Sequence, residues 1–415
     1  MQAVRYLAGV SILLALSGCG GGGGGGGGND KATPPPSAPE PNAKAHAMIN
    51  AEKPLRSTNI IIAVADSGTN TNHEEFEGTS IDARSGAFSY ESWYDTETQT
   101  FENELFTFDG DDHFPDYEVG AISDEAGHGT QVASLIFGKS RGLLTDGTLL
   151  VFDVTAAGEV SQGTFNPKGI GPSTRAAVLA ATEKSSAHKI DFMNLSMRDA
   201  DTYRAPERDG GLERDTFQKI KDRDIGVIAG AGNMSINLSE IYASDTPDCE
   251  KDWTESEEYG TPNYNRCYYL NSSRKTLDLI PYDDDILRNN FISVIAVKNN
   301  KQPAEFSNIP GTEPKIQERF ISAPGVLLDT ATIRDGEINT GYTSSTGTSF
   351  AAPLVTAAAG AVKSKFTSLS SAAVLQILLD TANKDFDGYD PKQHGMGILD
   401  VEAALNVNPN DYIGL

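Results

Sequence analysis

Short apolar runs of strand type alternate with helical stretches from about residue 56 onward, and this alternation restricts the fold more than any other feature. Five runs are typical of buried strands: residues 59–65, 149–154, 190–196, 226–231 and 291–297. Helical patterns occupy residues 128–137, 173–185, 212–222, 348–366 and 372–383. Strands that are apolar on both faces need cover on both faces, and the intervening helices supply it. The sequence therefore predicts an α/β fold with a mostly parallel central sheet.

The N-terminal part has a different composition. Residues 1–18 contain Arg5, an apolar run and two final small residues, a pattern typical of a secretory signal peptide. The apolar run is too short to span a bilayer as a permanent helix. Nine glycines and a proline-rich stretch follow, and such sequences form flexible or extended tethers. We expect a tether over residues 19–55, a folded domain over 56–407 and a tail over 408–415.

The sequence Leu16-Ser17-Gly18-Cys19 resembles the lipobox of bacterial lipoproteins, in which the cysteine is lipidated and becomes the mature N-terminus. The resemblance implies a membrane anchor at Cys19, the alternative being a plain signal peptide cleaved nearby. Gly20, and not Asp, follows the cysteine. By the same resemblance this favours a bacterial outer-membrane lipoprotein, on the surface or the periplasmic face, or released after cleavage of the tether.

Charge and cysteine usage restrict the partners and the compartment. Asp and Glu number 58 against 33 Lys and Arg, and the net charge is −25. Such a chain repels phosphates, so nucleic acid is not an expected partner. The cysteines are Cys19, Cys249 and Cys267. With Cys19 lipidated, Cys249 and Cys267 predict a disulfide in an exported protein, and two reduced thiols are the alternative.

Two segments interrupt the alternation, and we predict that both are surface insertions. Residues 86–120 are aromatic and acidic, and residues 236–290 are polar and contain the two distal cysteines. Acidic clusters at residues 109–112 and 283–285 offer oxygen ligands for structural calcium. Carboxylate spacing alone favours solvated loops, so we assign no metal site.

Three polar residues stand at places where functional groups gather in parallel sheets. Asp66 directly follows the first strand, and sites form beyond the carboxyl ends of strands, although a turn is the ordinary interpretation. His128 begins a helix between two glycines, where a cap or surface role is also open. Ser349 begins another helix, where serine is usually a cap but where a nucleophile would feel the positive end of the helix dipole.

Together these motifs carry a family resemblance. They are Asp66-Ser67-Gly68, Gly127-His128-Gly129-Thr130 and Gly347-Thr348-Ser349-Phe350-Ala351-Ala352-Pro353, in the order Asp, His, Ser. Both motifs and order resemble the subtilisin (subtilase) family. Residues 229–233, 306–308, 323–325 and 395–400 resemble further segments of it, so the resemblance covers about residues 59–405. It implies a subtilisin-like three-layer sandwich and a monomeric serine endopeptidase that needs no cofactor for its chemistry and acts on protein or peptide substrates.

The resemblance also assigns roles to individual residues. Asp66, His128 and Ser349 would form the catalytic triad, and the Asn233 amide would stabilise the oxyanion. The substrate would dock as an added strand along Ser196, Met197 and Arg198, against a pocket wall made of Ala229, Gly230, Ala231 and Gly232. Arg198 departs from the family, which commonly has glycine there, and it either alters specificity or points away. A histidine at the position of His73 is common in the family and non-catalytic.

Two other functions compete with this interpretation. One is a catalytically inactive, subtilase-like binding or adhesion lipoprotein, but an inactive relative normally lacks at least one of the four catalytic groups, and all four are present here. The other is an esterase, which the absence of a Gly-x-Ser-x-Gly elbow disfavours.

Because only a tether separates Cys19 from the domain, we expect no folded pro-segment.

Overall fold

The central sheet is organised around β1 (Ile61–Asp66), which pairs in parallel with β5 (Thr148–Asp153) on one side and β8 (Phe192–Leu195) on the other. The computed structural model describes residues 40–52, 54–95, 100–107, 124, 126–154, 159–161, 164–166, 174–186, 188–196, 218–243, 288–333 and 339–415. Within this part of the chain the sheet has nine strands, in the order β11-β10-β9-β8-β1-β5-β3-β4, with β2 paired to β5. The five predicted strands all lie in it.

The other strands of the sheet extend it in both directions. They are β2 (Ser80–Ile81), β3 (Gly86–Asp95), β4 (Thr100–Thr107), β9 (Gly226–Gly230), β10 (Phe291–Val297) and β11 (Phe320–Pro324). Neighbouring strands pair in parallel except β3 and β4, which form an antiparallel hairpin. Part of the expected insertion at residues 86–120 therefore continues the sheet, because Gly86 and Ala87 pair with the end of β5.

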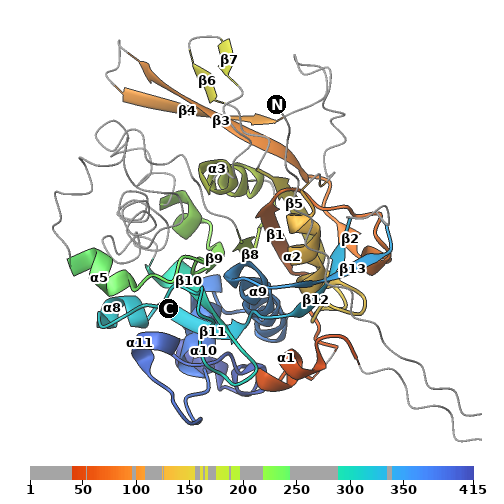
Figure 1. Ribbon diagram of the computed structural model, residues 1–415. Helices are drawn as coiled ribbons and strands as arrows, with labels where there is room; N and C mark the ends of the chain where they lie inside the picture. Colours follow the sequence, from red (N-terminus) through yellow and green to blue (C-terminus); the bar gives the residue numbers. More distant parts are fainter. Residues whose placement is uncertain are drawn as a thin grey trace, which may run out of the picture. The chain divides into compact units, whose positions relative to one another are not determined.

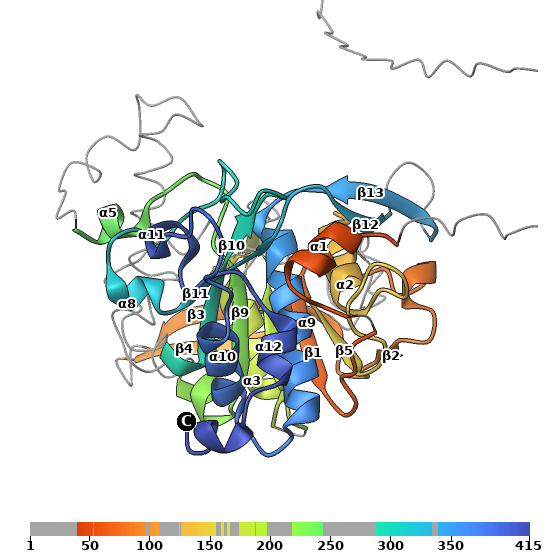
Figure 2. The same ribbon diagram turned by 90° about the horizontal axis from the view of Figure 1, so that it is seen from below.

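Helices cover both faces of the sheet (Figures 1 and 2). On one side lie α2 (His128–Phe137), α9 (Thr348–Lys365) and α10 (Ser371–Asp380); on the other lies α3 (Thr174–Lys184). Successive strand residues alternate between the two cores: Ile62 and Val64 pack with α2 and α9, whereas Ala63 and Ala65 pack with α3. This arrangement confirms the predicted three-layer α/β fold and the central strands that are apolar on both faces.

Smaller elements complete the described part of the chain. The helices are α1 (Ala43–Met48), α5 (Leu238–Ala243), α8 (Pro314–Gln317), α11 (Pro391–His394) and α12 (Val401–Leu405), and the short 3₁₀ turns are η1 (Glu74–Phe76), η3 (Arg288–Asn290) and η4 (Pro409–Tyr412). Two separate hairpins are β6 (Glu159–Ser161) with β7 (Thr164–Asn166) and β12 (Leu328–Thr332) with β13 (Gly341–Ser345). The second hairpin leads directly into α9, which begins at Thr348.

The folded unit begins at residue 40, which corrects the predicted tether boundary at residue 55. Ile49, just after α1, is fully buried in the main core, and Ala45 is 4% exposed. The Ile49 carbonyl accepts the Val401 backbone amide at 2.9 Å. A helix of six residues gives too short an apolar pattern to be recognised after a proline-rich stretch, and its stability comes from packing.

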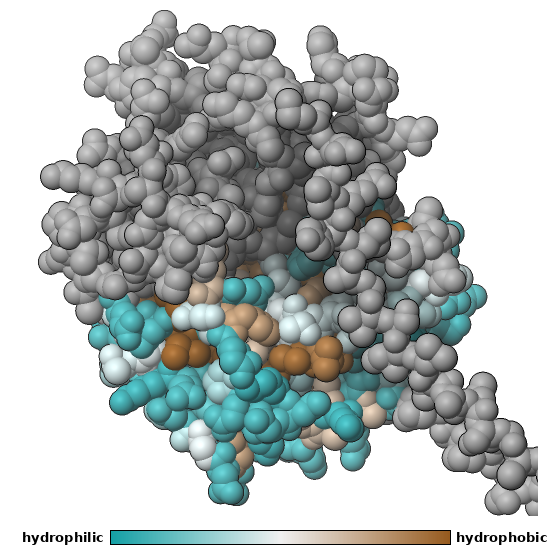
Figure 3. All heavy atoms as spheres, in the orientation of Figure 1, coloured by the Kyte–Doolittle hydropathy of each residue, from teal (hydrophilic) through white to brown (hydrophobic). Residues whose placement is uncertain are grey.

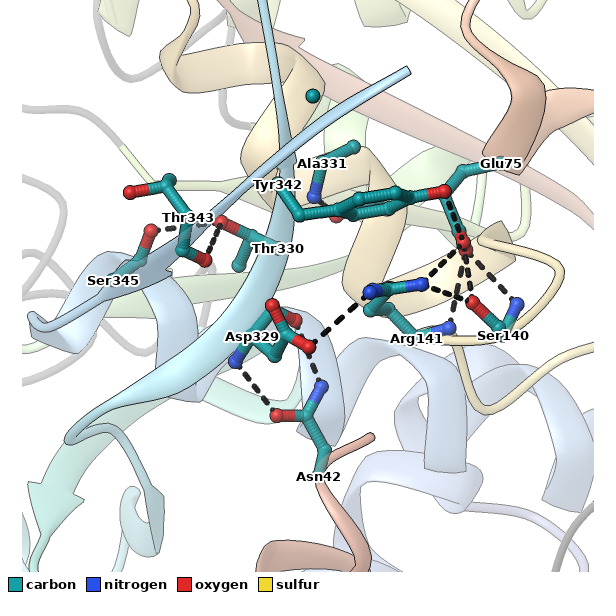
Figure 4. Close-up of polar contacts among 12 residues, drawn as sticks. Asn42, Glu75, Ser140, Arg141, Asp329, Thr330, Ala331, Tyr342, Thr343 and Ser345 are labelled. Carbon is teal, nitrogen blue, oxygen red and sulfur yellow. Dashed lines mark hydrogen bonds and ion pairs between the residues drawn. The ribbon is translucent and has the colours of Figure 1, made fainter. Parts of the chain in front are cut away.

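A polar cluster ties the β12–β13 hairpin to its surroundings (Figure 4). The Arg141 guanidinium lies 3.4 Å from the centroid of the Tyr342 ring and forms ion pairs with Glu75 and Asp329 at 3.1 and 3.2 Å. Asn42 exchanges two hydrogen bonds with the backbone of Asp329. The hairpin that precedes α9 is thus held both by the loop after α2 and by the N-terminal segment.

Hydrophilic residues cover much of the described surface in Figure 3, and hydrophobic ones occur there in small patches. None of the described helices is long and apolar enough to cross a membrane.

Candidate active site

Asp66 and His128 form a hydrogen-bonded pair at the carboxyl end of β1. The Asp66 side chain is fully buried, and its Oδ1 atom lies 2.8 Å from Nδ1 of His128, whose side chain is 30% exposed. A carboxylate accepts hydrogen bonds, so Nδ1 carries the hydrogen, and Nε2 of the neutral ring keeps its lone pair. The Ser67 amide donates a second hydrogen bond to Oδ1 at 2.8 Å. The imidazole is therefore held in one tautomer and one orientation.

Glycine at position 129 lets the first turn of α2 reach the Asp66 turn. A Cβ atom at Gly129 would lie 1.9 Å from the carbonyl oxygen of Gly68 and 3.1 Å from the Asp66 Cβ. Gly127, the residue before His128, has φ 81°, in the left-handed region that favours glycine. The two glycines around His128 thus bring its helix against β1, which explains the Gly-His-Gly pattern in physical terms.

Ser349 lies in the first turn of α9 and is tied to the end of β8. Its hydroxyl donates to the carbonyl oxygen of Ser196 at 2.9 Å, and the Ser196 hydroxyl donates to the Ser349 carbonyl at 2.8 Å. The next residue, Phe350, packs against the His128 ring with a centroid distance of 5.4 Å. The structure therefore brings the beginnings of α2 and α9 together beside the end of β1.

A buried polar chain lies behind Ser349. Asn194 donates to the Ser196 hydroxyl at 2.9 Å, and its carbonyl oxygen accepts the Thr356 hydroxyl at 2.9 Å. Asn194 and Thr356 are fully buried. Ser196 was predicted as a residue that contacts substrate, and it also fixes the first turn of α9. The positions of Asn194 and Thr356 within apolar patterns gave no signal of this connection.

Asn233 lies beside the first turn of α9, and its side-chain orientation is set by Thr348. The Asn233 carbonyl oxygen accepts from the backbone amide of Thr348 at 2.9 Å and from its hydroxyl at 3.0 Å. The amide Nδ2 is thereby turned toward Gly347, where an added Cβ would lie 3.5 Å from it. Asn233 is exposed, so Nδ2 is a hydrogen-bond donor at an accessible position next to Ser349.

The segment before Asn233 forms a tight wall against α9. A Cβ at Gly230 would lie 3.0 to 3.1 Å from atoms of Thr348, and the Gly232 amide donates to the Thr348 hydroxyl at 3.1 Å. Asn308 fixes the wall from behind: its Nδ2 donates to the Ala231 carbonyl at 2.9 Å, and its backbone amide donates to the Gly232 carbonyl. Of the predicted wall residues Ala229, Gly230, Ala231 and Gly232, the two glycines contact the first turn of α9, whereas the Ala229 side chain packs in the core on the α3 side of the sheet.

Of the other residues singled out in the sequence, His73 is described by the structure and several lie outside the described part. His73 is buried, with Nε2 2.9 Å from the Gly341 carbonyl and Nδ1 accepting the Glu75 amide, so both ring nitrogens serve the fold, as expected. The predicted residues Cys19, Met197, Arg198, Cys249 and Cys267 and the two acidic clusters lie outside the described residues. In the part of the chain that the structure covers, no group of His, Cys, Asp and Glu is arranged to hold a metal ion.

A further carboxylate was missed by sequence reasoning. Asp124 is 5% exposed and lies beside the first turn of α2, where it accepts a hydrogen bond from the Ser67 hydroxyl. Burial raises the pKa of the Asp124 carboxyl, and hydrogen bonds from Thr130, Ser67 and Gly127 oppose this effect. The only signal in the sequence was its position four residues before His128.

Comparison with known proteins places the chain in one family. The profile of the subtilase family (Peptidase_S8) matches residues 57–397. Subtilisin DY of Bacillus licheniformis is 27% identical over 282 residues, which cover 68% of this chain and 78% of that protein. Mycosin-5 of Mycobacterium tuberculosis is 30% identical over 242 residues, but the match spans only 36% of its length and 56% of this chain.

The fold is also similar to that of a solved protease. The epidermin leader peptide processing serine protease of Staphylococcus aureus superposes with a TM-score of 0.54, covering 88% of this chain and 79% of that one, at 18% identity.

Proposed function

Because the chain belongs to the subtilase family of serine peptidases, we propose that it is an endopeptidase that hydrolyses peptide bonds in proteins. The observation that carries the proposal is the 2.8 Å bond between buried Asp66 and Nδ1 of His128, whose ring packs against Phe350 in the first turn of α9. A neutral imidazole oriented by a buried carboxylate, beside a serine at a helix N-terminus, is suited to general-base activation of that serine.

In the proposed reaction, the Ser349 hydroxyl turns from the Ser196 carbonyl toward Nε2 of His128. Its oxygen attacks the scissile carbonyl carbon while its proton passes to Nε2, which gives a tetrahedral oxyanion and an imidazolium. The imidazolium returns the proton to the leaving amine as the C–N bond breaks, leaving an acyl-enzyme. Water then attacks the ester by the same proton transfers in reverse order. Asp66 stays ionised and stabilises the imidazolium throughout.

We assign stabilisation of the oxyanion to the Asn233 side-chain amide and the backbone N–H of Ser349. The hydrogen bonds from Thr348 to the Asn233 carbonyl oxygen support this role, because they leave Nδ2 as the outward-facing donor. A donor fixed before the reaction begins needs no reorganisation when the negative charge develops.

For substrate recognition, we propose that an extended peptide adds to the edge formed by Ser196, Met197 and Arg198. Strand addition gives affinity through main-chain hydrogen bonds, and side-chain pockets give specificity. The small residues 229–232 would form the wall of the primary pocket, and their lack of bulk would admit a large side chain. Arg198 would either alter specificity, for example toward acidic side chains, or point away from the substrate.

We also propose that the enzyme is exported and anchored by lipid at Cys19, as a monomer in the bacterial cell envelope, with the tether holding the domain away from the membrane. The support is the sequence alone: an apolar signal, the lipobox resemblance and the glycine run after Cys19. A Cys19→Ser variant should move from the membrane fraction to the soluble fraction. A variant that stays with the membrane would count against lipidation at this residue.

Labelling with a fluorophosphonate probe tests the proposed activity, because only an activated serine reacts with it. Wild-type protein should be labelled, and Ser349→Ala should not be, although it folds. Labelling retained in Ser349→Ala would assign the nucleophile elsewhere. Folded wild-type protein that neither takes up the label nor cleaves a peptide library would support the alternative, a subtilase-like binding or adhesion lipoprotein without activity.

A further inference from the structure

Hydrogen-bond donors from Ser67, Gly127 and Thr130 meet at the buried carboxylate of Asp124. Its Oδ1 atom accepts from the Gly127 backbone amide at 2.7 Å and from the Ser67 hydroxyl at 2.8 Å. Its Oδ2 atom accepts from the Thr130 amide at 2.7 Å. Amides of a helical first turn have no partner within the helix, so these bonds satisfy donors that burial would otherwise leave unpaired. Asp124 thereby closes the first turn of the helix that carries His128.

Ser67 connects this carboxylate to Asp66. The Ser67 hydroxyl lies 2.8 Å from Asp124 Oδ1 and 3.3 Å from Asp66 Oδ1, so its single hydrogen goes to Asp124. The hydroxyl oxygen accepts the backbone amide of Gly129 at 3.0 Å. The hydroxyl of Ser67, the residue after Asp66, thus links Gly129, the residue after His128, to the Asp124 carboxylate in the buried interior.

Burial raises the pKa of the Asp124 carboxyl, and the hydrogen bonds that it accepts favour its ionised form. Each carboxylate oxygen accepts at least one N–H or O–H group, and such donors stabilise the negative charge. The position beside the N-terminus of α2 also favours a negative charge, because the helix dipole is positive there. When ionised, the Asp124 carboxylate is separated from Asp66 by the Ser67 hydroxyl alone.

We infer that Asp124 is a positioning residue for His128: it fixes the backbone from which the imidazole reaches Asp66, and its negative charge favours the imidazolium. The inference rests on the proposed function for its kinetic consequences, since His128 must become positively charged during the reaction. A displaced ring would transfer protons along a poorer path, and small displacements are costly to rate.

A helix cap without a role in the site would also account for the amide bonds. The two possibilities differ in what they do to the His128 ring, because a cap affects stability and leaves the titration of the ring unchanged. Asp191 offers a matched control at the opposite end of β1. It is 6% exposed, burial raises the pKa of its carboxyl, and it accepts the Ile61 amide at 3.0 Å.

The test is Asp124→Asn, which keeps the shape and removes the charge and one acceptor. We expect kcat to fall about ten- to a hundredfold with KM within about twofold, and fluorophosphonate labelling to slow by the same factor. An NMR titration of the His128 ring should move to lower pH. Among described residues, Asp66 contacts the ring, Asp124 contacts the backbone of its helix, Asp153 on β5 pairs in register with Asp66, and Phe350 of α9 adds no charge.

Two further variants make the outcome decisive. Asp191→Asn should lower the melting temperature while kcat and the His128 titration stay at wild-type values. Ser67→Ala removes the bridging hydroxyl and should lower kcat in the same direction as Asp124→Asn, which tests the inference even where Asp124→Asn does not fold. A folded Asp124→Asn protein with wild-type kcat and wild-type His128 titration would overturn the inference. If Asp124→Asn does not fold, an unaltered kcat in Ser67→Ala would overturn it.

Failure of the proposed function gives a different result. An inactive wild-type protein whose His128 titration nevertheless moves to lower pH in Asp124→Asn would contradict the endopeptidase activity and support the positioning role. An inactive protein in which the substitution leaves the titration unchanged would contradict both.

Discussion

Truncation of Ile49 to alanine tests whether the residues before the sheet are part of the folded core. Ile49 is fully buried among core residues, and its carbonyl accepts the Val401 amide at 2.9 Å. Two further bonds join Asn42 to Asp329 on the hairpin before α9. If residues 40–55 were a tether, as their composition suggests, this substitution would have no effect on stability.

The expected cost follows from the burial of the side chain. Ile49→Ala removes three carbon atoms from a site with no exposed surface, and each buried CH₂ group contributes about 0.8 kcal/mol. The remaining cavity adds to this transfer cost, so we expect a loss of about 3–4 kcal/mol. With an unfolding entropy of about 2.1 cal/mol/K per residue over roughly 370 residues, the melting temperature should fall by about 4–5 °C.

The assay is thermal and urea unfolding followed by circular dichroism, with Lys44→Ala as the control. Lys44 lies on the same helix and is exposed, so its truncation should change the unfolding free energy by less than about 0.5 kcal/mol. Equal unfolding curves for Ile49→Ala and Lys44→Ala would refute the reasoning, because they would mean that α1 contributes nothing to the core.

Three other predictions follow from the site and its surroundings. Asn233→Ala should lower kcat about a hundred- to a thousandfold with little change in KM, and a loss below about fivefold in folded protein would contradict its role at the oxyanion. Burial raises the pKa of Glu75, but hydrogen bonds from Ser140 and Arg141 outweigh it, and the pKa lies below the ordinary value of 4.5. The stability from this group is therefore present above pH 4.5 and lost as the pH falls through the folded pKa, so the difference in unfolding free energy between wild type and Glu75→Gln should shrink at acid pH. A constant difference would contradict this. Cys249 and Cys267 should appear as one linked peptide in non-reducing mass mapping, and two alkylated thiols would exclude the disulfide.

The central strands could be predicted because both of their faces are buried. The runs that contain β1, β5 and β10 are continuous and apolar, and such runs have few interpretations other than a covered parallel strand. The positions of Asp66, His128 and Ser349 also followed from local signals, since each stands at the end of a strand or the start of a helix. These features depend on residues close together in the chain.

The contacts that could not be predicted from the sequence join residues far apart in the chain. Asp124 has no local pattern, and its importance depends on Ser67, which is 57 positions away. The reciprocal bonds between Ser196 and Ser349 join residues 153 positions apart. The helix α1 has only six residues, and its burial is decided by the distant segment around Val401. Polar groups give no periodic signal, so their partners appear only when the fold is known.

Long-range hydrogen bonds have the same effect at the start of α2 and at the start of α9. In α2, the amides of Gly129 and Thr130 are satisfied by side chains of Ser67 and Asp124. In α9, the Thr348 amide is satisfied by the side chain of Asn233. Since the first amides of a helix have no partner within it, such acceptors fix where each helix begins.

The acceptor Ser67 directly follows β1, and Asn233 lies three residues after β9. These strands are the neighbours of β8 on either side, so the sheet sets the distance between the two helix starts. The hydroxyl and the imidazole are therefore placed by the most buried part of the fold, before any substrate binds. In the proposed reaction this placement lowers the reorganisation needed when charge develops on His128 and on the oxyanion. Substitutions that loosen either helix start should then reduce kcat more than they reduce substrate binding.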